Sequence, residues 1–264
     1  MAAITSTANP RVKALARLRS RRERDRVGAT LIEGHDELQL ALAAGVLPSE
    51  LWWSPTLARP EQHGLLAAVR STGAEIVEVS PEVFQRVAYR ESPDGWLALA
   101  PSPGRPLTDL RPGPNCLVLV AEGIEKPGNL GALFRTAEAF GADAVISASG
   151  ATDLGNPNVV RASKATVFSI AVAAAPTAEV IAFLRDYGIR IVVTTPAGTK
   201  APAEVELTGP TALVIGAEST GVTSQWLAAA DDTVVIPMHG QVNSLNAAAA
   251  GAITLYEANR QRAR

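Results

Sequence analysis

The chain has 264 residues, 47% of them hydrophobic and 19% charged, with a formal net charge of -2 at pH 7. This composition is typical of a globular protein with one large or two smaller domains and excludes a disordered chain. The near-neutral total gives no overall preference for nucleic acid. The single cysteine, Cys116, excludes an internal disulfide framework, and it begins an apolar run in which a buried, inert thiol is expected.

Targeting and membrane signals are absent from the sequence. No run reaches the roughly 18 apolar residues that a membrane-spanning helix needs, and the N-terminal residues form no apolar signal core. We therefore expect a cytoplasmic protein that does not enter a membrane.

The first 30 residues are polar and basic, with a partial helical period of apolar residues. Eight basic residues fall within positions 11–26, opposed only by Glu23 and Asp25. Such a segment is either a solvated helix face or a surface for a polyanion.

Residues 30–100 predict a small α/β unit, because short apolar runs alternate with amphipathic segments. Strands are expected at 30–34, 51–53, 75–79 and 96–100, and helices at 38–42, 65–70 and 81–87. Residues 101–114 then contain five prolines and two glycines, which predicts a semi-rigid linker.

The pattern restarts more strongly after the linker. Near-continuous apolar strands are expected at 117–121, 144–147, 167–173, 189–194, 212–215 and 233–236, and helices at 129–140, 177–187 and 224–229. Strands of this kind that alternate with helices indicate a parallel sheet covered on both faces.

The last helix is expected to begin after a polar loop that follows Pro237. From Asn246 onward the sequence is rich in alanine, which favours a helix that packs closely against another element or another subunit. Asn243 or Ser244 is the expected N-cap. Considered alone, this stretch also fits an ordinary core helix with a polar entry loop.

Three loops follow predicted strands, where open α/β sheets bind ligands. The first, 122–135, reads EGIEKPGNLGALFR; the second, 213–221, reads LVIGAESTG; the third is the stretch that begins at Ile236. Asn129 and Arg135 would share one side of their helix only if that helix begins after Asn129. Each loop could equally hold no more than a helix cap and surface polar residues.

Several chemistries have little support in the sequence. The three histidines are far apart without partners at metal-ligand spacing, so no metal site is predicted. A G-x-S-x-G nucleophile motif, a phosphate-binding P-loop and the G-x-G-x-x-G spacing of dinucleotide-binding proteins are all missing.

Taken together, the three loops resemble the signature motifs of the SpoU (TrmH) family of RNA 2′-O-ribose methyltransferases, in the SPOUT superfamily. The matching segments are NLGALFRTAEAFGA at 129–142, IGAESTG at 215–221 and IPMHGQVNSLN at 236–246. Residues 158–168 are similar to the substrate-side segment of that family. The N-terminal region, with Leu31 to Gly34, is similar to a small ribosomal-protein-like substrate-binding domain.

The resemblance implies an architecture. We expect an N-terminal α/β substrate-binding domain at 1–100, a Pro-rich linker at 101–114 and a methyltransferase domain at 115–264 with a parallel sheet and a deep trefoil knot. A knot is an exception to the rule that chains do not thread their own loops. Members of the family bind S-adenosylmethionine in the knot and work as homodimers.

The resemblance also assigns roles to residues. The catalytic polar residues would be Asn129, Arg135, Glu218, Ser244 and Asn246. The cofactor would be bound by Thr195, Pro196, Ala197, Gly216, Ile236, Met238, Ser244 and Leu245. With an RNA substrate implied, the basic run at 11–26 and the segment at 158–168 become the expected RNA contacts, through Arg11, Lys13, Arg19, Arg22 and Arg161. No metal is implied.

The role of Arg135 stays open between a general base and a phosphate clamp. An arginine side chain resists deprotonation because its pKa lies above about 12, so we favour a clamp that also stabilises developing alkoxide character. The chain departs from the family pattern at Ser219-Thr220 and at 247–250. Neither departure removes a polar catalytic group.

The sequence thus predicts an enzyme that methylates a ribose 2′-hydroxyl in structured RNA, with 23S ribosomal RNA as first substrate and transfer RNA as second. Two alternatives remain: an RNA-binding assembly factor without turnover, and a dinucleotide-dependent α/β enzyme. The sequence does not name the methylated nucleotide, nor does it separate a housekeeping role from protection against an antibiotic.

Overall fold

The structure, a computed structural model, describes residues 3–263. The chain forms two compact units, one made of Met1–Pro103 with Asp153–Ser169 and the other of Gly104–Thr152 with Ile170–Arg264. The boundary between the two units therefore lies within the predicted linker. Ser102 still donates a hydrogen bond to Gly28 in the first unit, and Arg105 donates one to Val172 in the second.

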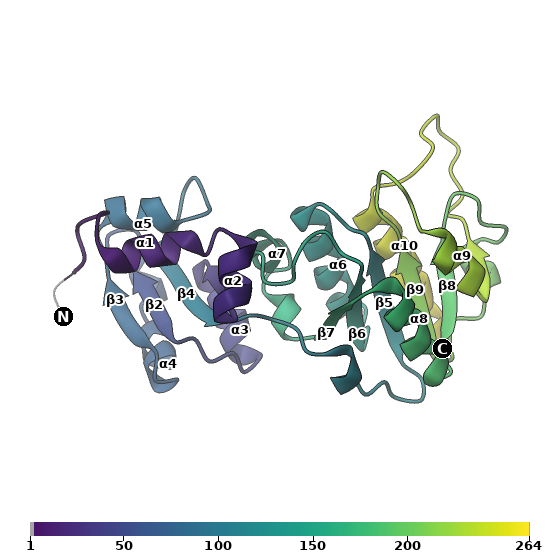
Figure 1. Ribbon diagram of the computed structural model, residues 1–264, viewed down its shortest axis with the longest axis horizontal. Helices are drawn as coiled ribbons and strands as arrows, with labels where there is room; N and C mark the ends of the chain where they lie inside the picture. The colour runs from purple at the N-terminus through teal and green to yellow at the C-terminus, as the bar shows by residue number, and fades with distance from the viewer. Residues whose placement is uncertain (1–2, 264) are drawn as a thin grey trace. The chain divides into compact units, whose positions relative to one another are not determined.

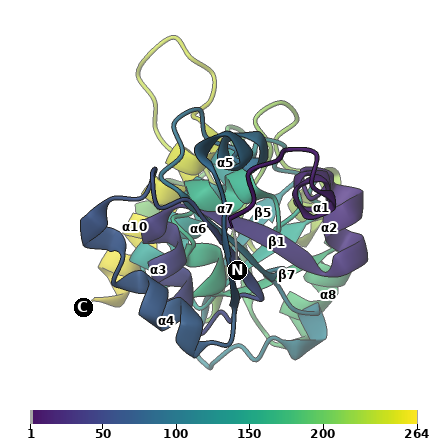
Figure 2. The ribbon, with the colours of Figure 1, turned by 90° about the vertical axis from the view of Figure 1, so that its left-hand side faces the viewer.

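The first unit is built on a mixed four-stranded sheet in the order β1-β4-β2-β3. Its strands are β1 (Ala29–Glu33), β2 (Glu50–Trp53), β3 (Glu75–Glu78) and β4 (Trp96–Pro101), each within one residue of its predicted ends. Its helices are α1 (Pro10–Arg17), α2 (Arg21–Val27), α3 (His35–Ala43), α4 (Leu65–Ser71), α5 (Pro81–Val87) and α7 (Pro157–Ala162). Figure 2 shows α1 and α2 on one side of this sheet and α3 and α4 on the other.

The second unit contains a parallel sheet of six strands in the order β10-β8-β9-β5-β6-β7. The strands are β5 (Leu117–Glu122), β6 (Ala144–Ala148), β7 (Ala171–Ala175), β8 (Arg190–Thr194), β9 (Thr211–Ile215) and β10 (Asp232–Val234). The helices are α6 (Pro127–Ala139), α8 (Thr177–Asp186), α9 (Ser224–Ala229) and α10 (Ala247–Arg262). The predicted α/β fold with a parallel sheet is confirmed. Strand order alone does not test the trefoil knot, which stays a prediction.

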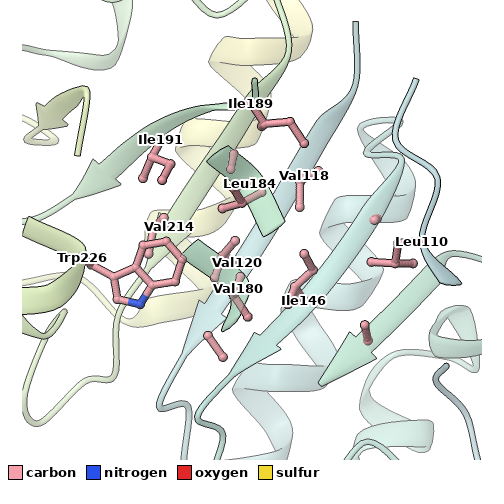
Figure 3. Packing of buried hydrophobic residues seen from close by; sticks show 14 of the residues in the cluster. Leu110, Val118, Val120, Ile146, Val180, Leu184, Ile189, Ile191, Val214 and Trp226 are labelled. Carbon is pink, nitrogen blue, oxygen red and sulfur yellow. The ribbon is translucent and has the colours of Figure 1, made fainter. Parts of the chain in front are cut away.

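Helices cover both faces of the parallel sheet. Figure 1 shows α6 and α10 behind the sheet, with α8 in front. Figure 3 shows the core on the α8 and α9 side, where strand residues such as Val118, Val120 and Val214 pack with Leu184 and Trp226. These side chains are almost fully buried. Burial on both faces explains why the strands carry near-continuous apolar runs.

Residues 153–169 differ from their prediction. The strand expected at 167–173 is instead a 3-10 turn at Thr166–Phe168 followed by β7, and α7 was not predicted. Lys164 and Ala165, just before the predicted strand, have left-handed φ angles of 53° and 63°. The amides of Phe168 and Ser169 then donate to the carbonyls of Ala165 and Thr166, both at 3.0 Å, which are the bonds of a 3-10 turn and not those of a strand. The segment, predicted to lie in the methyltransferase domain, packs instead with the first unit.

Two helix starts also differ. The N-cap of α10 is Asn246, whose side chain accepts from the amides of Ala248 and Ala249, and not Asn243 or Ser244. Asparagine satisfies these amides well, so the preceding loop extends three residues further than Asn243 would allow. Helix α6 begins at Pro127, before Asn129. The condition under which Asn129 and Arg135 would share a helix side is therefore not met.

Candidate active site

A cavity of about 320 Å³ opens at the carboxyl ends of β8, β9 and β10. Three loops that are far apart in the sequence form it, which follows from the parallel strands that precede them. It is lined by Thr194, Thr195, Pro196, Ile215, Gly216, Ala217, Glu218, Thr220, Gly221, Val222, Leu227, Val235, Ile236, Met238, Ser244, Leu245, Ala247 and Ala250.

Glycines bring the backbones of these loops close together. A Cβ atom on Gly216 would lie 2.4 Å from the carbonyl carbon of Gly221, and one on Gly198 would lie 2.3 Å from that of Val234. Thr195 donates its amide to the Val234 carbonyl at 2.9 Å, which ties the loop after β8 to the end of β10. Only residues without side chains permit such approaches.

Most of the residues assigned to cofactor binding line this cavity. The seven that do are Thr195, Pro196, Gly216, Ile236, Met238, Ser244 and Leu245. Ala197 does not line it; its amide donates to the Thr195 hydroxyl at 3.4 Å.

The five residues assigned to catalysis fall into three groups. Glu218 and Ser244 line the cavity. Asn246 donates to the Asn129 side-chain oxygen at 3.2 Å, so these two form a pair beside the start of α10. Arg135 is exposed on α6 and makes no hydrogen bond or ion pair within residues 3–263.

Three buried polar atoms at the site have no hydrogen-bond partner within the described part of the chain. They are Glu218 Oε1, Thr194 Oγ1 and Asn129 Nδ2. Glu218 and Thr194 line the cavity, whereas Asn129 does not. Buried polar atoms are nearly always paired, so the two unpaired oxygens in the cavity wall indicate a ligand that supplies the partners. The sequence reasoning missed Thr194, because it is the last residue of β8 and belongs to none of the three motifs.

The residues assigned to RNA binding are not equally available. Arg11 is held by both oxygens of Glu75 at 2.8 and 2.9 Å, and Arg19 donates to the Ala88 carbonyl at 2.7 Å. Lys13 and Arg22 are exposed, and Arg161 is half-buried on α7. None of these last three side chains has a partner within residues 3–263.

The described residues contain no group of three or more histidine, cysteine or acidic side chains that could hold a metal ion. Within residues 3–263, no helix combines the length and the apolar character that crossing a membrane requires.

Comparison with known proteins identifies relatives over the whole chain. The model of the SpoU rRNA Methylase family matches residues 116–256, and that of the MRM3-like substrate binding domain matches residues 9–98. The chain is 29% identical to the 23S rRNA (guanosine(2553)-2′-O)-methyltransferase RlmP of Bacillus subtilis, over 97% of this chain and 98% of that protein.

Two solved structures are similar throughout. A crystal structure of an RNA 2′-O ribose methyltransferase is 42% identical, with a TM-score of 0.88 and full coverage of both chains. An AdoMet-bound rRNA methyltransferase from Sinorhizobium meliloti is 29% identical, with a TM-score of 0.90, over 98% of this chain and 97% of that one.

Proposed function

The chain belongs to the SpoU rRNA methylase family, and we propose that it transfers a methyl group from S-adenosylmethionine to a ribose 2′-hydroxyl of structured RNA. The observation that carries this proposal is the cavity itself, where the motifs at 215–221 and 236–246 meet and leave buried polar atoms unpaired. Asn129 of the first motif is connected to it through the hydrogen bond from Asn246. We propose 23S ribosomal RNA as the substrate, because the B. subtilis relative acts on it and the chain matches a substrate-binding domain at 9–98. Such a substrate would be met in the cytoplasm.

The cavity fits S-adenosylmethionine. Its volume lies within the usual range for small-molecule sites, and its lining combines apolar side chains with a few polar ones. Gly216 leaves a backbone cradle that any side chain would fill. The backbone of Gly216, Ile236 and Leu245 would hold the adenosyl part, and Glu218 and Thr194 offer unpaired oxygens to polar groups. When bound, this cofactor supplies an electrophilic methyl carbon on a sulfonium.

The residues of this chain would then align the acceptor. Asn129 and Asn246, already paired at 3.2 Å, present amides that can orient the ribose beside Ser244. Arg135 would bind the adjacent phosphate and stabilise negative charge on the 2′-oxygen while the hydroxyl proton passes to solvent water, since a guanidinium that is already protonated cannot accept it. The 2′-hydroxyl is also the group that distinguishes RNA from DNA, so this arrangement selects RNA.

Methyl transfer to RNA tests the proposal directly. The purified protein should bind S-adenosylmethionine in calorimetry and transfer labelled methyl to ribosomal RNA. Arg135→Ala should abolish transfer and leave cofactor affinity unchanged, whereas Glu138→Ala, an exposed change on the same helix, should alter neither. Cofactor binding without transfer by the wild type would favour an assembly factor. Nicotinamide binding in its place would favour a dinucleotide-dependent enzyme.

We also propose a homodimer formed through α10. Ile253 and Tyr256 are 41% and 56% exposed on this helix, while Gly251 packs against Leu133 of α6 on its other side. Exposed apolar side chains on an alanine-rich helix suit a subunit interface. Sedimentation should give a dimer that Tyr256→Asp dissociates, and a monomeric wild type would refute the proposal.

The domain division rests on the same comparisons. We propose residues 1–100 as the RNA-binding domain and 115–264 as the catalytic domain, joined by 101–114, with residues 153–169 of the catalytic range packed on the first unit. The two family models match within these ranges.

A further inference from the structure

Glu122 is a buried carboxylate that none of the three motifs assigns to the reaction. It is the last residue of β5, its residue surface is 2% exposed, and it makes no ion pair within residues 3–263. Both oxygens accept hydrogen bonds instead. Oε2 accepts from the Thr223 amide at 2.9 Å, and Oε1 accepts from the Thr223 hydroxyl at 2.8 Å and more weakly from the Thr177 hydroxyl at 3.4 Å.

Thr223 is the residue through which Glu122 reaches the cavity. It is the N-cap of α9, where a threonine hydroxyl ordinarily accepts from helix amides, yet it makes no such bond. Its hydroxyl donates to Glu122 instead. Val222 precedes it and Leu227 follows on α9, and both line the cavity. A shift of Thr223 would therefore move two parts of the cavity wall.

A second, longer contact to the carboxylate comes from the Thr177 hydroxyl. Thr177, at the start of α8, donates its amide to the Ser149 hydroxyl oxygen at 3.0 Å, and the two hydroxyl oxygens also lie 3.0 Å apart. Ser149 has a left-handed φ of 47° just after β6. Glu122 thus joins the ends of β5 and β6 to the loop that runs from Gly216 to Thr223.

A buried carboxylate without a cation costs free energy, and an apolar residue could fill the same space. What the carboxylate supplies is a set of directional acceptors. We propose that Glu122 is a positioning residue, which acts through Thr223 to hold the 216–222 wall in the geometry that binds the methyl donor. This inference rests on the proposed function for the identity of the ligand.

Glu122→Gln tests the inference, because the amide retains one acceptor but turns an N–H toward a donor. We expect the Kd for S-adenosylmethionine, measured by calorimetry, to rise about tenfold or more. The KM for the cofactor should rise with it, while kcat at saturation stays close to the wild-type value. Glu179→Gln, which neutralises an exposed carboxylate at the start of α8, should leave both constants unchanged.

A second variant and a second measurement separate this role from a general loss of stability. Thr223→Val removes the hydroxyl at nearly constant volume and should weaken cofactor binding less than Glu122→Gln. The double variant should be no worse than Glu122→Gln alone, because both changes break the same contact. Amide hydrogen exchange in residues 216–223 of the cofactor-free protein should be faster in both variants.

The outcomes distinguish the two proposals. Wild-type cofactor affinity and unchanged exchange in Glu122→Gln would overturn the positioning role. If Glu122→Gln does not fold, Thr223→Val carries the same test. If the wild type binds no S-adenosylmethionine, the proposed function fails, and exchange in residues 216–223 alone decides whether Glu122 holds this wall.

Discussion

Gly216 lies where the cavity wall leaves no room for a side chain. An alanine Cβ would lie 2.4 Å from the Gly221 carbonyl carbon and 2.5 Å from the Val222 amide nitrogen, and backbone atoms cannot rotate away. We expect Gly216→Ala to lower cofactor affinity by about tenfold and to destabilise the fold by about 1–3 kcal/mol. Calorimetry and urea unfolding would measure the two effects.

Gly240 provides the matched control for this substitution. It lies in the loop before α10, and a Cβ there would meet no atom within 4 Å. Gly240→Ala should leave affinity and stability unchanged. Equal effects of the two substitutions would mean that the close approach at Gly216 does not shape the cavity.

At the residue scale, the sequence identifies side chains that belong to a motif and misses those that act through contacts. The resemblance to the family motifs led to Glu218, Ser244 and Asn129, each of which lies after a predicted strand. Glu122 ends a strand that is otherwise apolar, and this isolated charge was the one available signal for it. Its partner Thr223 lies 101 residues away, so no local pattern could predict their hydrogen bond.

At the element scale, a buried ion pair joins residues 153–169 to α2. Arg24 is 2% exposed and donates to Asp153 at 2.8 Å, and the Thr30 hydroxyl donates to the Gly155 carbonyl at 2.6 Å beside it. Removing one partner leaves the other charge buried and unpaired. We therefore expect Arg24→Ala to destabilise the first unit by about 3 kcal/mol.

Tryptophan fluorescence suits this measurement, since Trp52, Trp53 and Trp96 belong to the first unit and only Trp226 to the second. Urea unfolding of the whole chain should show an earlier fluorescence transition in Arg24→Ala. Arg22→Ala removes an exposed arginine without a partner within residues 3–263. This control should change the free energy of unfolding by less than about 0.5 kcal/mol. Coincident transitions in the two variants would contradict the proposed contribution of the pair.

The same contacts explain which elements could be predicted. Strands with a clear apolar period, such as β5 and β9, appear within a residue of their expected ends. The structure of residues 153–169 was not predicted correctly, because it depends on hydrogen bonds to residues more than 100 positions earlier, such as Thr30. The apolar period of a segment predicts which of its residues are buried, but it does not predict which part of the protein they pack against.

Asp232 gives the edge strand β10 a dependence on pH. The Lys200 ammonium, which donates to it at 2.6 Å, holds the pKa of this carboxyl below its usual value, against the burial that would raise it. A lowered folded-state pKa means stability that is fully present above the unfolded value of about 3.9 and is lost as pH falls through the folded value. Asp232→Asn removes this contribution.

The urea midpoints of the wild type and Asp232→Asn should therefore differ clearly at pH 7, and the difference should shrink below about pH 4. Other acidic groups affect both proteins alike and cancel in the comparison. A difference that stays constant down to pH 2 would show that the contact with Lys200 does not depend on the charge of Asp232.

At the scale of the whole molecule, the distribution of charge matters more than its sum. The net charge of -2 would repel RNA weakly, yet α1 and α2 carry a dense run of basic residues. Part of that run is already used within the protein, because Arg11, Arg19 and Arg24 are bonded to protein oxygens. Lys13, Arg17 and Arg22 remain exposed and have no partner within residues 3–263.

We therefore expect these three residues to supply the contacts to RNA phosphates. Changing all three to alanine should weaken the binding of every RNA by a similar factor, since phosphate contacts carry no sequence information. The slope of the logarithm of the RNA association constant against the logarithm of the salt concentration should fall in magnitude by about 2 to 3. Each lost phosphate contact means that about one counterion fewer is released from the RNA. Filter binding at salt concentrations from about 50 to about 300 mM would measure the slope.

Arg185 serves as the control for total charge, because it is held by Asp231 at 2.9 Å in the second unit. Arg185→Ala removes one positive charge away from the basic run and should leave the salt slope unchanged. If the triple variant instead kept its slope and lost affinity for one RNA only, the three side chains would be reading bases and not phosphates. The basic run would then contribute to the choice of nucleotide and not only to RNA affinity.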